Sequence, residues 1–169
     1  MKWNTKQLTL CAMLAALALA LSYIERMFPP PVPLPGVKLG LANIVTVFAL
    51  YALGASQALL ILLTRVLLGA MFAGNASALL YSLLGGLAAL LVMTALSRFD
   101  ALSVYGVSVG GAAAHNLGQI AAAMLTLGTA APLAYLPVLL LVALFSGALT
   151  GFIAALLFRA MEHTKIINP

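Results

Sequence analysis

The chain has 169 residues, of which 64% are hydrophobic and 7% are charged, and its formal net charge is +5. A soluble domain normally carries about 25% charged residues, so this composition excludes a water-soluble globule. It predicts a single all-α integral membrane domain over residues 1–169. The basic residues lie mostly at the ends of apolar segments and are not interleaved with aromatic residues, so membrane topology explains them and no nucleic-acid partner is expected.

Apolar runs and the residues that interrupt them predict six transmembrane helices. A membrane span needs about 20 residues. The second and third predicted helices are shorter than this, which fits either a tilted hairpin or partial spans. In chain order, the predicted helices cover approximately residues 5–27, 38–53, 56–72, 75–96, 102–127 and 132–161.

The first predicted helix carries a stripe of small residues. Ala12, Ala16 and Ala20 recur at four-residue spacing, so they share one helix face and allow another helix to approach closely. Two readings stay open, packing within this chain and docking of a partner subunit. The run Ala18-Leu19-Ala20 resembles a signal-peptidase site, but we interpret the segment as a retained first helix.

The segment after the first helix holds five prolines within residues 29–35. Proline cannot donate a backbone hydrogen bond, so we expect a stiff loop that covers a site. Lys38 follows, at the predicted start of the second helix. A cation is unfavourable beside a helix N-terminus, whereas an incoming anion would find both Lys38 and free backbone N–H groups. The alternative is a surface network of Lys38 with Glu25 or Arg26.

The distribution of Lys and Arg predicts that both termini are cytoplasmic. With the N-terminus inside, five cationic residues lie at cytoplasmic ends and two lie outside, which follows the positive-inside rule. The proline segment then faces outward. The cytoplasmic set is Lys2, Lys6, Arg98, Arg159 and Lys165, and the outer set is Arg26 and Lys38.

A charged residue lies deep within the third predicted helix. Arg65 falls near the middle of this helix, and a charge at that depth needs a partner inside the protein. Glu25 is placed near the outer surface and Asp100 near the inner one, so no acidic residue is expected at the depth of Arg65. The counter-charge is then a ligand, or else carbonyl, Asn or Gln groups satisfy the guanidinium.

The fifth predicted helix carries a polar face. His115 and Gln119 are separated by one helical turn, with Asn116 beside them. In an apolar helix such a face favours a binding cavity over isolated packing residues. Asn75 either joins this site or caps the fourth helix. The candidate substrate-binding set is Lys38, Asn43, Arg65, Asn75, His115, Asn116 and Gln119.

Catalytic and metal-binding motifs are not found in the sequence. The chain has three acidic residues in total, too few for the paired Asp-rich motifs that hold magnesium on a diphosphate substrate. Neither an enzyme activity nor a metal or other cofactor is expected. No nucleotide-binding Gly-x-x-x-x-Gly-Lys-Ser/Thr pattern is present, so ATP chemistry would belong to another chain.

Three motifs resemble a known family. They are Pro35-Gly36-Val37-Lys38-Leu39-Gly40-Leu41-Ala42-Asn43-Ile44, Arg65-Val66-Leu67-Leu68-Gly69 and Ala114-His115-Asn116-Leu117-Gly118-Gln119. The chain is thereby similar, over essentially its whole length, to the Gx transporter family, whose members are often labelled heptaprenyl diphosphate synthase component I. That family looks similar to the substrate-binding S components of energy-coupling factor transporters.

The resemblance implies a six-helix S component of an importer in the bacterial cytoplasmic membrane. Its partners would be a transmembrane coupling subunit, docked on Ala12, Ala16 and Ala20, together with two ATPase subunits and membrane lipid. The substrate would be a small vitamin- or cofactor-like molecule with an anionic or polar group, captured from outside beneath the proline loop. The alternatives are a subunit of polyprenyl (heptaprenyl) diphosphate synthesis and a non-transport membrane scaffold of a quinone or redox complex.

Overall fold

The computed structural model describes residues 4–29, 40–73 and 76–164. Of these residues, 86% are helical and none forms a strand, which confirms the all-α prediction. The α-helices are α1 (Thr5–Glu25), α2 (Asn43–Ala52), α3 (Ala55–Ala73), α4 (Ala76–Leu96), α5 (Val104–Leu127) and α6 (Leu136–Thr164), and a short 3-10 helix, η1 (Ala131–Tyr135), precedes α6.

Four helical segments of the described chain are long and apolar enough to cross a membrane. They are α1, most of α3, α4 and the continuous stretch Ala131–Ala160 that joins η1 to α6. At about 1.5 Å per residue, the ten residues of α2 extend only about half the thickness of the hydrocarbon core. The chain is therefore a multi-helix membrane protein, and the count of six spans stays a prediction.

Two helix starts differ from the sequence-based boundaries. α2 begins at Asn43, later than the predicted residue 38, because Gly40 has a φ of 85° and a turn follows at Leu41 and Ala42. A left-handed residue cannot continue a right-handed helix. Before α6, Pro132 lies in η1, so the regular α-helix begins only at Leu136.

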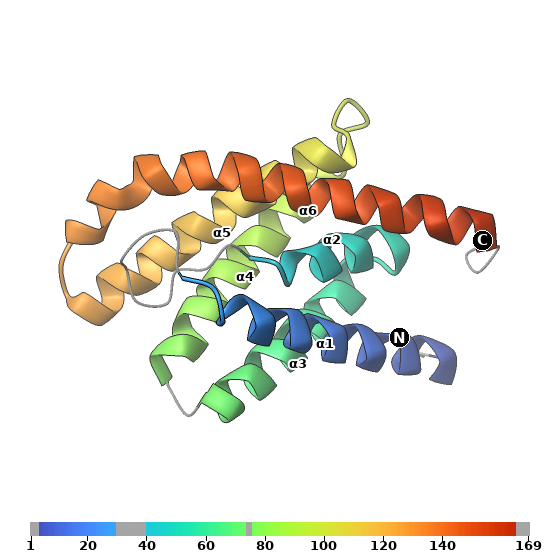
Figure 1. Cartoon of the computed structure of the whole chain (residues 1–169), viewed down its shortest axis with the longest axis horizontal. Coiled ribbons are helices and arrows are strands. Elements are labelled where there is room, and N and C mark those ends of the chain that lie inside the picture. Colours follow the sequence, from blue (N-terminus) through green and yellow to red (C-terminus); the bar gives the residue numbers. More distant parts are fainter. Residues whose placement is uncertain (1–3, 30–39, 74–75, 165–169) are drawn as a thin grey trace.

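The helices form one bundle in which α5 packs between α4 and α6. Figure 1 shows α6 along one long side and α1 with α3 toward the other side, with the start of α1 and the end of α6 at the same end of the molecule. This arrangement agrees with the expectation that both termini lie on one side of the membrane. Which side is cytoplasmic stays a prediction.

Small residues allow α5 to approach its two neighbours closely. A Cβ atom on Gly118 would lie 2.7 Å from the carbonyl carbon of Leu84 and 2.8 Å from the Cα atom of Gly85, both in α4. On the other side, a Cβ atom on Gly147 of α6 would lie 2.6 Å from the Cα atom of Val109. Such backbone-to-backbone contact is the usual basis of helix packing in membranes.

Gly128 ends α5 in the left-handed conformation, with a φ of 66°. A Cβ atom there would meet no other atom within 4 Å, so a substitution tests backbone conformation alone. We expect Gly128→Ala to lower the free energy of unfolding by about 1 kcal/mol, and Gly128→Asn to lose less because Asn tolerates this conformation. Thermal unfolding in detergent measures both variants. Equal losses in the two would contradict the explanation.

Candidate functional site

Arg65 is the one charged residue in the sequence of α3, and it is buried. Its side chain is only 8% exposed, and its Nη1 atom donates a hydrogen bond of 3.2 Å to the Ser22 hydroxyl on α1. The Nε and Nη2 donors have no hydrogen-bond partner among the described residues. These two atoms form one edge of the guanidinium, whose parallel N–H groups match the paired oxygens of a carboxylate or phosphate.

Glu25 is the acidic partner of Arg65, so the expectation that no acidic residue reaches Arg65 is wrong. The Glu25 side chain is 6% exposed, it attracts Arg65 electrostatically, and its carboxylate accepts a hydrogen bond from the Gly40 N–H. Buried charges need such compensation. Glu25 is thus a site residue that the sequence-based set lacked.

The parallel packing of α1 on α3 explains this pairing. Ser22 bonds Arg65 and, four residues further along both helices, Arg26 donates to the Gly69 carbonyl at 3.2 Å. Glu25 follows Ser22 by three residues, so its backbone lies about 5 Å further along the helix axis than the backbone of Arg65. The long arginine side chain spans that offset. The sequence does contain a pattern that indicates this pairing. Ser22 and Glu25 are three residues apart, which places both on one face of α1.

Three further predicted residues lie on the same cavity as Arg65. His115 and Gln119 reach it from α5, and Asn43 reaches it from the first turn of α2; all three are buried. The Asn43 Oδ1 atom has no hydrogen-bond partner among the described residues. Gly85 of α4 leaves the space for the α5 side chains, since a Cβ atom there would lie 2.9 Å from His115 Cε1.

These residues enclose a small cavity, lined mainly by polar residues, between α1, α2, α3, α4 and α5. The space open to the centre of a water molecule is about 10 Å³, which is room for about one water. A cation, an anion and several neutral polar side chains therefore lie close together at one buried point of an apolar bundle. The cavity lining comprises Ser22, Glu25, Gly40, Ala42, Asn43, Arg65, Ser82, His115 and Gln119.

Asn116, another predicted site residue, does not line this cavity. Asn116 is buried against α6, where its Nδ2 atom donates to the Leu139 carbonyl at 2.7 Å. Its neighbour His115 lies on the cavity side of α5. Lys38 and Asn75 lie outside the described residues, as does the proline loop beyond Pro29.

The alanine stripe of α1 faces away from the bundle. Ala12, Ala16 and Ala20 are exposed, whereas Cys11 and Ala15 are buried. Within the described chain the stripe is therefore not the main packing face of α1, and its role in partner docking stays a prediction.

Comparison with known proteins gives one match. A family model described as heptaprenyl diphosphate synthase component I matches residues 14–157, a range that includes the cavity residues from Ser22 to Gln119. No curated protein and no solved structure matches the chain. Because the family match covers most of the sequence and agrees with the motif resemblance, the protein belongs to the heptaprenyl diphosphate synthase component I family.

Proposed function

We propose that the protein is the substrate-binding membrane subunit of an energy-coupling-factor-type importer. The observation that carries the proposal is the Nε–Nη2 edge of Arg65, which has no hydrogen-bond partner among the described residues and is buried within an apolar helical bundle. Leaving buried donors of a charged group without acceptors is costly, and ionisable groups at membrane depth usually serve a function. A ligand with two adjacent acceptor atoms would satisfy both donors.

The pairing of Arg65 with Glu25 refines the class of ligand. Because Glu25 already offsets the guanidinium charge, the ligand needs paired acceptors more than it needs net negative charge. Carboxylates and phosphates qualify, and so does a heterocycle with neighbouring acceptors. Asn43, His115 and Gln119 supply further polar groups around the same point. This combination fits a small vitamin- or cofactor-like molecule.

Binding of such a molecule requires the cavity to widen. The free space is about that of one water, so an empty and a loaded protein would differ in helix packing around Arg65. In the proposed importer, energy for release would come from two ATPase subunits through a transmembrane coupling subunit. The exposed stripe Ala12, Ala16 and Ala20 is the proposed contact for that coupling subunit.

The test is recovery of a small molecule with the purified protein. Wild-type protein is extracted from its native membrane and denatured, and the released compounds are identified by mass spectrometry. We expect one compound to be at least about tenfold depleted in Arg65→Lys, because lysine keeps the charge but lacks the planar pair of donors.

Asn116→Leu is the matched control, since Asn116 bonds α6 and does not line the cavity. This variant should keep the compound. Equal recovery from wild type and Arg65→Lys would refute the site. Co-purification of a coupling protein and two ATPases would support the importer role separately.

A second candidate is a subunit of heptaprenyl diphosphate synthesis, which the family description favours. Prenyl transfer by the purified protein with magnesium and allylic diphosphate, alone or with a co-purifying soluble subunit, would support this candidate. Co-purification of redox proteins without ATPases would instead favour a membrane scaffold.

A further inference from the structure

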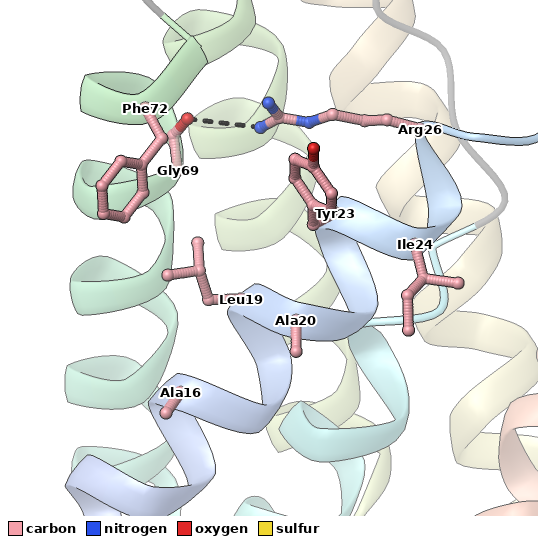
Figure 2. Close-up of a pocket in the computed structure, with 8 residues that line it drawn as sticks. All are labelled: Ala16, Leu19, Ala20, Tyr23, Ile24, Arg26, Gly69 and Phe72. Carbon is pink, nitrogen blue, oxygen red and sulfur yellow. Dashed lines mark hydrogen bonds between the residues drawn. The ribbon is translucent and has the colours of Figure 1, made fainter.

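A second cavity lies on the outer surface of the α1–α3 pair, apart from the buried site. We call it the α1–α3 groove, and its volume is about 470 Å³. Its walls are mainly apolar and include small residues of both α1 and α3. The lining residues are Ala16, Leu19, Ala20, Tyr23, Ile24, Arg26, Gly69 and Phe72, as drawn in Figure 2.

Among the described residues that line the groove, the charged group and the hydroxyl lie at one end (Figure 2). Figure 2 shows the Arg26 side chain reaching from the end of α1 across to Gly69, with the Tyr23 hydroxyl at the same end and Ala16 at the other. One guanidinium N–H group bonds the Gly69 carbonyl at 3.2 Å. A guanidinium has five N–H donors, so Arg26 keeps donors for a second acceptor at the mouth of the groove.

The position of the groove places this polar end at the membrane interface. Both α1 and α3 are long and apolar enough to span a membrane, and Arg26 directly follows the last residue of α1. Phe72, which lines the groove, and its chain neighbour Met71 are each 76% exposed, as expected of side chains that face lipid. Arginine and tyrosine at the end of a span are typical interfacial anchors.

We propose that the α1–α3 groove binds one phospholipid. The phosphate accepts hydrogen bonds from Arg26, and an acyl chain lies along Ala20 and Ala16. Charge complementarity selects this occupant, because a single cation at the interfacial end of an otherwise apolar groove matches an amphiphile with one anionic end. A net-anionic headgroup is preferred, since Arg26 is the only charged residue among the described residues that line the groove. This inference goes beyond the proposed import function and does not depend on it. Because Ala16 and Ala20 also belong to the stripe proposed for the coupling subunit, lipid and subunit would occupy this surface in turn.

The experiment uses the full-length protein in bilayer discs that contain phosphatidylglycerol and phosphatidylcholine with identical acyl chains. Native mass spectrometry then measures the fraction of protein that retains each lipid. We expect wild type to retain one phosphatidylglycerol preferentially. Arg26→Gln should lower that fraction about tenfold, the effect of losing one charge-assisted hydrogen bond. Ala20→Trp should lower it similarly by filling the groove, and Ala20→Leu should lower it less.

Two controls separate this site from general lipid contact and from the proposed docking stripe. Arg159→Gln removes an exposed arginine on α6, and Ala12→Trp enlarges a stripe residue that does not line the groove. Both should retain the lipid as wild type does, and all variants should match wild type in helicity and elution volume.

Equal lipid retention by wild type and Arg26→Gln would overturn the proposal, as would equal losses in all variants. Binding of glycerol phosphate as strongly as phosphatidylglycerol would show an anion site without a lipid. If Ala12→Trp and Ala20→Trp both displaced a co-purifying protein while lipid retention stayed constant, the groove would be a protein interface, and the lipid inference would be wrong.

Discussion

Replacing Arg65 with methionine is expected to lower the free energy of unfolding by about 3–5 kcal/mol. The variant would leave the buried Glu25 carboxylate without the cation that attracts it, and a buried charge left without its opposite charge is strongly destabilising. Reversible unfolding in mixed detergent micelles, followed by circular dichroism, measures the change.

A double-mutant cycle tests whether the loss arises from this pair. We expect Glu25→Gln to restore much of the stability of Arg65→Met, because replacing both charges removes the uncompensated carboxylate. Arg159→Met is the control for loss of a cation, since Arg159 is exposed on α6, and it should change stability by less than about 0.5 kcal/mol. Additive effects of the Glu25 and Arg65 substitutions would show that the two residues are not coupled.

The second large effect is expected at Gly118. In Gly118→Ala the new methyl group would lie against the Leu84 carbonyl oxygen and 2.8 Å from the Gly85 Cα atom. Both are backbone atoms, which cannot rotate away, so α4 and α5 must move apart. We expect a loss of about 3 kcal/mol, the upper end of the usual cost of overpacking, measured by unfolding in the same micelles. The shift would also displace His115 and Gln119 from the cavity.

Gly106→Ala is the matched control on the same helix. Its methyl group would lie 3.3 Å from the Leu102 Cδ2 atom, which belongs to a flexible side chain. Rotation of the Leu102 side chain therefore relieves the clash, and alanine has a higher helix propensity than glycine. A stability change within about 0.5 kcal/mol is expected. A similar loss in both variants would mean that the close approach at Gly118 is not the cause.

The fold was largely predictable because apolar runs and their breakers mark helices directly. The bounds of α4 and α5 lie within two residues of the expected ones. The start of α2 was not predictable, since Gly40 and Leu41 continue an apolar pattern. Gly40 has a positive φ, and its N–H group donates to a carboxylate from another helix, a contact that the local sequence does not reveal.

Site residues were predictable where their positions depend on the spacing within one helix. They were not predictable where their positions depend on how two helices pack along each other. The helical spacing of His115 and Gln119 correctly places both on one cavity. Asn116 is rotated about 100° from His115 around α5, which directs it to α6. Glu25 was missed because its depth was judged from the membrane surface, whereas its distance to Arg65 depends on the parallel packing of α1 and α3.

The hydrogen bond from the Gly40 N–H to Glu25 makes this amide a natural reporter of the cavity. Backbone amide protons exchange with solvent deuterium only after their hydrogen bond opens. Exchange at Gly40 therefore requires Glu25 to leave the turn before α2. The exchange rate of this single amide, followed in the unlabelled protein, would measure the free energy of that local opening and its change when a ligand is added.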